Sequence, residues 1–174
     1  MFLLCHNRLS DILKSCGKRY MRFQSPKIVA RNVELLMKRY GITWFKFSDN
    51  TFLLRNVNEL RELRDLLKPL HIMFGCSVDP MTITEEKVII AKEMGCVAMT
   101  IGVETVNEML RKNALGINIS NEDIIKSVHI AKDQGVKVST FNMIGLPGET
   151  KENVFETLRL NKKLGVPDTN LYIM

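Results

Sequence analysis

The chain has 174 residues, of which 45% are hydrophobic and 25% are charged, and its formal net charge is +6. This balance is typical of one globular domain that buries its own core, and it excludes an intrinsically disordered chain. No apolar run approaches the ~20 residues that cross a bilayer, and the opening Phe2-Leu3-Leu4 is too short for a signal peptide. The four cysteines show no disulfide spacing, so we expect a cytoplasmic protein.

The positive charge is concentrated near the start of the chain. Residues 1–40 hold nine lysines and arginines against two acidic residues. One interpretation is a patch for an anionic ligand or a nucleic acid. The other is a solvated face, or a face that contacts something absent from this chain. The second is favoured because no pattern of stacking aromatic residues accompanies the charge.

One short element recurs along the chain, Lys-x-x-Gly followed by an apolar, β-branched run. Its glycines are Gly41, Gly95, Gly135 and Gly165. Lysine suits the negative carboxyl end of a helix, and glycine takes the left-handed conformation just beyond it. The run that follows suits a strand buried on both faces. The spacing of the last three glycines is that of one βα unit each.

Helix starts agree with this repeat. Ser25-Pro26, the boxes Thr82 to Glu85 and Ser120 to Asp123, and Thr150 all predict helix amino termini. We therefore predict helices over 26–40, 57–68, 84–94, 106–114, 121–134 and 151–164. We predict strands over 43–48, 71–77, 97–103, 136–144 and 169–174.

Five strands that alternate with helices predict an α/β fold with a parallel sheet and right-handed crossovers. The chain is too short for a closed eight-stranded barrel, which takes about 250 residues. It also lacks the G-x-G-x-x-G turn of a dinucleotide-binding sheet. Because residues 170–174 end inside a strand with an open edge, we predict part of a parallel (β/α) barrel.

Polar groups follow the strands. The strand ends read Ser48-Asp49-Asn50, Ser77-Val78-Asp79, Glu104-Thr105 and Asn142-Met-Ile-Gly145. One such residue would be an ordinary helix cap. Four at the same edge predict a polar pocket, because parallel barrels form their sites at the carboxyl ends of the strands. The loop GLPGET (145–150) fits either a simple αβ turn or the close approach of a ligand.

The pair Cys5-His6 is too small for a metal site by itself, which needs three cysteines or a Cys/His quartet. Taken together, however, the motifs resemble the radical S-adenosylmethionine enzymes, in particular the subgroup associated with cobalamin-binding domains. The resemblance covers nearly the whole chain. The motifs that carry it are CHN, GKRYMRFQSP, ITWFKFSDNTF, FGCSVDPMTITEEKVIIAKEMGCVAMTIGVET, NISNEDI and FNMIGLPGET.

The resemblance implies a partial barrel of six βα units, of which five are present and the first strand is missing. It implies one incomplete domain, with 1–24 the remnant of a cluster-binding loop and a basic segment, and 25–174 the βα units. In this family a C-x3-C-x2-C loop holds a 4Fe-4S cluster that cleaves S-adenosylmethionine to a 5′-deoxyadenosyl radical. The family also implies an electron donor such as flavodoxin or ferredoxin, and the subgroup implies cobalamin held by a domain absent here.

By this resemblance, Cys5 matches the third cysteine of the loop and is the metal ligand. Asp49 lines the pocket near the methionine end of the cofactor. Glu104 lies toward its ribose or amino group, and Asn142 and Gly145 lie beside its adenosyl group. Carboxylate and amide groups suit hydroxyl and ammonium donors.

The chain departs from the family pattern at two places. Phe2 stands where the second cysteine belongs, and the first would precede Met1. Gly116 and Ile117 stand where the family often has a basic residue, which leaves Arg111 or Lys112 as substitutes or as solvated helix positions. One thiolate does not hold a cluster, so we expect little catalysis from this chain alone.

Three hypotheses follow. The first is the central piece of a radical S-adenosylmethionine enzyme, cut at both ends. The second is a degenerate barrel without catalysis that binds a nucleoside-like ligand. The third is an RNA-binding or RNA-modifying module, suggested by the basic segment. The sequence does not identify the substrate, because the fold alone does not set function.

Overall fold

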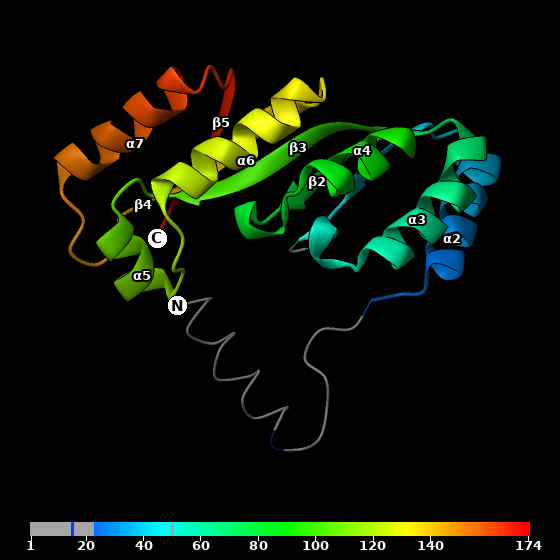
Figure 1. The fold of residues 1–174 in the computed structure, drawn as a ribbon, viewed down its shortest axis with the longest axis horizontal. Helices are drawn as coiled ribbons and strands as arrows, with labels where there is room; N and C mark the ends of the chain where they lie inside the picture. Colours follow the sequence, from blue (N-terminus) through cyan, green and yellow to red (C-terminus); the bar gives the residue numbers. More distant parts are fainter. Residues whose placement is uncertain (1–14, 16–22, 50) are drawn as a thin grey trace.

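The computed structural model describes residues 15, 23–49 and 51–174. Its five strands are β1 (Trp44–Phe47), β2 (Met73–Val78), β3 (Cys96–Glu104), β4 (Lys137–Ile144) and β5 (Asp168–Ile173). Its helices are α2 (Pro26–Tyr40), α3 (Val57–Leu67), α4 (Glu85–Glu93), α5 (Glu108–Leu115), α6 (Asn121–Asp133) and α7 (Lys151–Lys163) (Figure 1). Short 3-10 turns are η1 (Phe52–Leu54), η2 (Lys68–Leu70) and η3 (Pro80–Thr82). Each predicted helix and strand is confirmed, with bounds that differ by no more than two residues.

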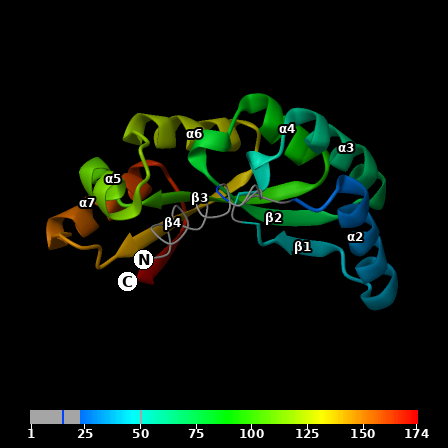
Figure 2. The ribbon, with the colours of Figure 1, turned by 90° about the horizontal axis from the view of Figure 1, so that it is seen from below.

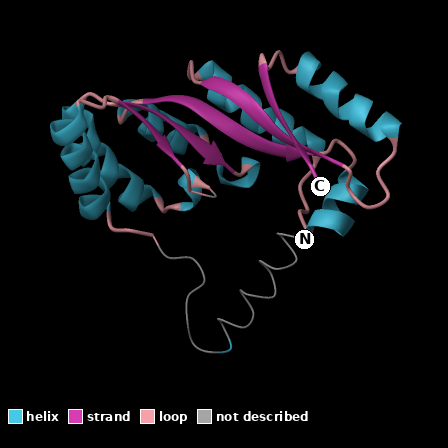
Figure 3. Cartoon of the chain, turned by 180° about the vertical axis from the view of Figure 1, so that it is seen from behind, coloured by secondary structure: helices cyan, strands magenta, loops and turns pink. Residues whose placement is uncertain are grey.

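The strands form one parallel sheet in the order β1-β2-β3-β4-β5. Helices α3, α4 and α6 pack on one face of this sheet, and no described helix covers the opposite face (Figures 2 and 3). Because chain order and sheet order agree throughout, the sheet has no point where its winding reverses, unlike a dinucleotide-binding fold. The architecture is an open half-barrel, as the sequence predicted. No helix among the described residues is both long and apolar enough to cross a membrane.

The two faces of the sheet differ in chemistry. Large side chains such as Phe74, Met99 and Ile101 are fully buried against the helices. Over its middle the open face carries small or hydroxyl-bearing residues, in register across the strands: Gly75 and Ser77, Ala98 and Thr100, Gly102, and Ser139. Larger side chains stand on either side of them, namely Trp44 and Lys46 on β1 and Lys137 and Phe141 on β4. A closed barrel fills its interior with bulky branched side chains. The half-barrel therefore leaves space on its concave side for something other than its own residues.

Side-chain caps begin most helices where the sequence placed them. Ser25, Ser120 and Thr150 each accept a hydrogen bond from a backbone N–H of the first turn. The cap predicted at Thr82 is wrong, because Thr84 caps α4 by accepting from the backbone N–H of Lys87. Thr82 instead ends η3, a turn that Asp79 caps and that the sequence did not indicate.

The Lys-x-x-Gly repeat joins neighbouring units. The ammonium group of Lys92 on α4 donates to the carbonyl of Gln134 at the end of α6. One unit later, Lys132 on α6 donates to the carbonyls of Leu164 (2.8 Å) and Gly165 (3.3 Å) at the end of α7. Lys92 and Lys132 therefore each stabilise the carboxyl end of a helix in the following βα unit, where the carbonyls lack partners, and not the end of their own helix.

The repeat has one more member, which the search for glycine missed. In Lys68-Pro-Leu-His71 the backbone N–H of His71 donates to the carbonyl of Lys68, the same bond that Gly95 makes to Lys92. His71 holds the left-handed conformation, with φ 50°. A non-glycine residue accepts this conformation at a cost of about 1 kcal/mol or more, which explains why glycine takes the position elsewhere.

Lys132→Ala is expected to lower the free energy of unfolding by about 1 kcal/mol, because it leaves two helix-end carbonyls without their donor. The loss should be local to the end of α7, one unit away from the substitution. Hydrogen exchange of Gly165 and Val166 should accelerate, while the end of α6 stays protected. Lys126→Ala on the exposed side of α6 is the matched control, and equal exchange in both variants would contradict this role for Lys132.

Candidate functional site

Four residues expected at the site lie at the carboxyl ends of successive strands, β1 to β4. Asp49 follows β1 and is exposed. Asp79 follows β2, and its carboxylate accepts from the backbone N–H of Met81 at 2.8 Å. Glu104 ends β3, and Gly145 follows β4. The strand-end edge therefore carries three carboxylates and one glycine.

The backbone at Glu104 is unusual. Glu104 pairs with Asn142 across a register shift between Gly102 and Glu104, so β3 carries a bulge here. Its φ is 63°, a conformation that costs a side-chain-bearing residue of order 1–3 kcal/mol. A Cβ placed on Gly102 would lie 2.9 Å from Oε1 of Glu104. Gly102 thus leaves the room that the Glu104 carboxylate occupies.

One oxygen of this carboxylate has no partner. Oε2 of Glu104 is buried and makes no hydrogen bond within the described part of the chain. A buried acceptor without a donor costs about 1–3 kcal/mol. Burial raises the pKa of Glu104 from its ordinary value of 4.5 to about 7, the charge of Arg111 opposes the rise, and the charge of Asp79 adds to it. Glu104 is therefore ready to accept a hydrogen bond from a ligand.

Arg111 lies beneath the strand-end edge with 1% of its surface exposed. Its guanidinium donates to the carbonyl of Thr105 at 2.7 Å and 3.1 Å, to the carbonyl of Ile119 at 2.5 Å, and to Oδ1 of Asn121. Burial lowers its pKa. Its donors hold the chain on both sides of α5, so the guanidinium is occupied by two backbone carbonyls and the Asn121 side chain. Arg111 therefore does not substitute for the basic residue that the resemblance implied near position 116.

Asn142 is fully buried, and its side chain faces the helices. Its amide nitrogen donates to Oγ1 of Thr140 at 3.1 Å, and its oxygen accepts from Nδ2 of Asn161 on α7 at 3.1 Å. The structure therefore does not bring this amide to the open face beside Glu104. Asn142 joins β4 to α7, and α7 follows the loop that contains Gly145.

The GLPGET loop is closed by its own glutamate. The Glu149 carboxylate accepts from the backbone N–H groups of Gly145 at 2.7 Å and Leu146 at 3.3 Å. Gly145 is exposed and has φ 88°. The loop thus presents a bare backbone at the strand-end edge, fixed by the half-buried Glu149 carboxylate.

Cys5 and Phe2 lie outside the described residues. The two cysteines among the described residues, Cys76 and Cys96, are buried, and their sulfur atoms are 3.9 Å apart. The hydrogen bond between the two thiols and their burial raise the pKa of Cys76, which keeps it a thiol. Across residues 23–49 and 51–174, no three His, Cys, Asp or Glu side chains gather as a metal site.

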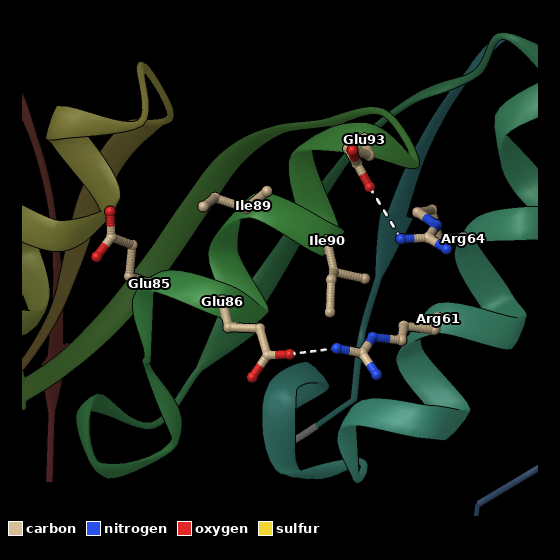
Figure 4. A pocket seen from close by; sticks show the side chains of 7 residues that line it. All are labelled: Arg61, Arg64, Glu85, Glu86, Ile89, Ile90 and Glu93. Carbon is tan, nitrogen blue, oxygen red and sulfur yellow. Dashed lines mark hydrogen bonds and ion pairs between the residues drawn. The ribbon is translucent and has the colours of Figure 1, made fainter.

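A surface groove of about 420 Å³ lies between α3 and α4, and residues of these two helices line it (Figure 4). Arg61 pairs with Glu86 at 2.6 Å, and Arg64 pairs with Glu93 at 3.1 Å. These ion pairs cross the groove and neutralise its charges. It contains no strand-end residue, so it is not part of the candidate site.

Comparison with curated proteins gives two relatives. The chain is 30% identical over 151 residues to an uncharacterized methyltransferase of Pyrococcus horikoshii, a match that covers 86% of this chain and 32% of the relative. It is 21% identical over 145 residues to the anaerobic magnesium-protoporphyrin IX monomethyl ester cyclase of Rubrivivax gelatinosus, covering 82% of this chain and 26% of the relative. The chain thus spans about a third or less of these proteins.

Among solved structures, the fold is similar to TsrM of Kitasatospora setae, a radical S-adenosylmethionine methyltransferase with cobalamin and a 4Fe-4S cluster bound. The TM-score is 0.74 at 21% identity, over 90% of this chain and 29% of the other. This likeness shows the half-barrel fold. The sequence profile of the Radical SAM superfamily matches residues 5–160, which is most of the chain. The chain therefore belongs to the radical SAM superfamily.

Proposed function

We propose that this chain is the S-adenosylmethionine-binding core of a radical SAM enzyme, with Glu104 as the residue that receives the cofactor. The observation that carries the proposal is the buried, unpartnered Oε2 of Glu104 at the end of β3. A ribose hydroxyl or an ammonium group supplies the donor that this oxygen lacks. Gly102 supports this role because a Cβ there would lie 2.9 Å from Oε1 of Glu104 and would crowd the carboxylate.

The other strand-end residues take supporting roles in this proposal. The exposed backbone of Gly145 lets a flat adenosyl group approach the edge without meeting a side chain. Asp49 is exposed at the end of β1 and suits the ammonium of the methionine end. Asn142 acts indirectly, by holding β4 against α7 through Asn161.

A 4Fe-4S cluster, when bound, supplies the electron for reductive cleavage of S-adenosylmethionine to a 5′-deoxyadenosyl radical. In this proposal Cys5 is one thiolate ligand, and Phe2 occupies the place of another. The described residues offer no other cysteine set, since Cys76 and Cys96 are buried thiols. We therefore propose little catalysis by these 174 residues alone, and an electron donor such as flavodoxin or ferredoxin for the complete enzyme. Cobalamin, held by a further domain, is part of the same proposal because TsrM contains it.

A binding barrel without catalysis is the second candidate, and Phe2 favours it. Both candidates use Glu104, so cofactor binding does not separate them. Anaerobic reconstitution of the complete protein that contains this chain separates them: about four irons per protein with release of 5′-deoxyadenosine on reduction supports the enzyme. Absence of iron uptake by the complete protein, with retained nucleoside binding, supports the degenerate barrel.

Glu104→Gln tests the proposed site. We expect calorimetric titration with S-adenosylhomocysteine at pH 8, above the Glu104 pKa of about 7, to show an affinity about tenfold lower, because an ionised acceptor binds a hydroxyl more strongly than an amide does. Glu62→Gln on exposed α3 is the control and should bind like the wild type. Equal affinities for all three proteins would remove Glu104 from the site.

A further inference from the structure

A row of four residues crosses the open face with a lysine at each end. Lys46 of β1 is in register with Gly75 of β2, Gly75 with Ala98 of β3, and Ala98 with Lys137 of β4. Between the two lysines the row carries no side chain larger than a methyl group. Strands lie about 4.8 Å apart, so the end strands of this lysine row are about 14 Å apart.

The packing around Gly75 confirms which face the row occupies. A Cβ on Gly75 would lie 3.7 Å from Cζ2 of Trp44 and 3.8 Å from Cβ of Ala98, so these side chains share one face. Phe74, the neighbour of Gly75, packs with Phe47 and Phe52 on the opposite, helix-covered face. No described helix lies over the row, as the view from behind the sheet shows (Figure 3).

Neither lysine is neutralised. Lys46 and Lys137 are exposed, and neither ammonium makes a hydrogen bond or ion pair with a described residue. The next row toward the carboxyl ends carries the hydroxyls of Ser77, Thr100 and Ser139, and those of Thr100 and Ser139 are 2.8 Å apart. Asp168 ends this second row on β5 and is the acidic group closest in register. Two cations without a partner among the described residues therefore lie beside a row of hydroxyl groups.

Trp44 gives the row an apolar wall. Its indole lies beside the floor of Gly75 and Ala98, yet 51% of its surface is exposed. An exposed tryptophan on the same strand and face as Lys46 suits a ligand with anionic groups and an apolar body. A small monoanion pairs with one lysine, whereas a dianion pairs with both when the two lysine side chains extend toward it across the row.

We propose that the lysine row binds a ligand with two anionic groups, a dicarboxylate or a diphosphate, as the anionic end of the enzyme's substrate. This inference rests on the proposed function, because that function places the cofactor at Glu104 on the same open face. On β3 and β4 the row lies near the amino-terminal end of the strand, whereas Lys46 is the last residue but one of β1. The substrate therefore extends along β3 and β4 from the lysine row to the strand-end edge.

Trp44 makes the proposal testable, because it is the single tryptophan of the chain. Its fluorescence is recorded during titration with inorganic pyrophosphate and, separately, with glutarate, at constant ionic strength. We expect a saturable change with at least one of the two, and none with acetate. Lys46→Ala and Lys137→Ala should each weaken binding about fivefold. Lys151→Ala, an exposed lysine at the start of α7, is the matched control.

A change that never saturates, or affinities equal in the row variants and Lys151→Ala, would overturn the proposal. Binding at the cofactor site is measured in parallel by titration with S-adenosylhomocysteine. Absence of binding by both pyrophosphate and glutarate would contradict the lysine-row proposal, whereas absence of S-adenosylhomocysteine binding would contradict the proposed role of Glu104. If S-adenosylhomocysteine displaces pyrophosphate, and Lys46→Ala weakens both ligands, the row belongs to the cofactor and the substrate assignment is wrong.

Discussion

Arg111→Met is expected to lower the free energy of unfolding by about 3–5 kcal/mol, the largest effect of any single substitution considered for this chain. Methionine keeps the apolar stem but removes every donor that the guanidinium supplies to Thr105, Ile119 and Asn121. The two carbonyls then remain buried without partners, and each costs about 1–3 kcal/mol. Urea denaturation followed by circular dichroism measures the loss.

The neighbouring Lys112 supplies the control, because it is exposed. Lys112→Met should change stability by less than about 0.5 kcal/mol. Arg111→Lys restores the charge without the planar fork, so it should recover only part of the loss and keeps the test informative if Arg111→Met does not fold. A loss below about 1 kcal/mol in Arg111→Met would show that the buried guanidinium is not the brace described here.

Glu104→Gln is expected to stabilise the protein at pH 8 by about 2–3 kcal/mol more than at pH 5. The pKa of Glu104 is raised to about 7 in the folded chain, from an ordinary value of 4.5. Between these values the folded state holds a proton that the unfolded state releases, so wild-type stability falls as the pH rises toward 8. Glutamine does not ionise and escapes this loss.

Unfolding by urea at pH 5, 6, 7 and 8 measures the difference between variant and wild type. Glu62→Gln should follow the wild type at every pH, because that side chain is exposed. A Glu104→Gln difference that stays constant over this range would mean that the Glu104 carboxyl titrates normally. Replacing Arg111 should move the transition to higher pH, since its charge opposes the rise in the pKa of Glu104.

The order and bounds of the elements could be predicted from local chemistry. Lysine and glycine mark the ends of helices, and serine and threonine mark their starts. The β-branched runs that lie between one helix end and the next helix start are then assigned as strands. Strand-end residues such as Asp49 and Glu104 follow from the same pattern, because parallel strands present their carboxyl ends at one edge. The open half-barrel could then be predicted from the number of these βα units.

Side-chain direction could not be predicted in the same way. In β4 the polar Thr140 lies on the covered face and the apolar Phe141 on the open face, so residue type does not show which face Asn142 occupies. The bulge between Gly102 and Glu104 shifts the pairing of β3 with β4, and no residue type in IGVET announces it. The sequence suggested that Arg111 is a cofactor ligand or a solvated residue. Its main partners are backbone carbonyls, which every residue has, so no residue type in the sequence indicates that Arg111 binds them.

The lysines that reach from one helix to the end of the next have a consequence for recombining such barrels. When a single βα unit is exchanged between two proteins, the helix of the following unit loses the lysine that donated to its last carbonyls. The last carbonyls of the exchanged helix likewise need a lysine on the helix of the preceding unit. For this chain, a junction between α4 and α6 separates Lys92 from Gln134, and one between α6 and α7 separates Lys132 from Leu164. Chimeras should therefore be more stable when the lysine and the helix-end carbonyls it binds come from the same parent protein. This condition is met when two consecutive units are exchanged as a pair, and not when one unit is exchanged alone.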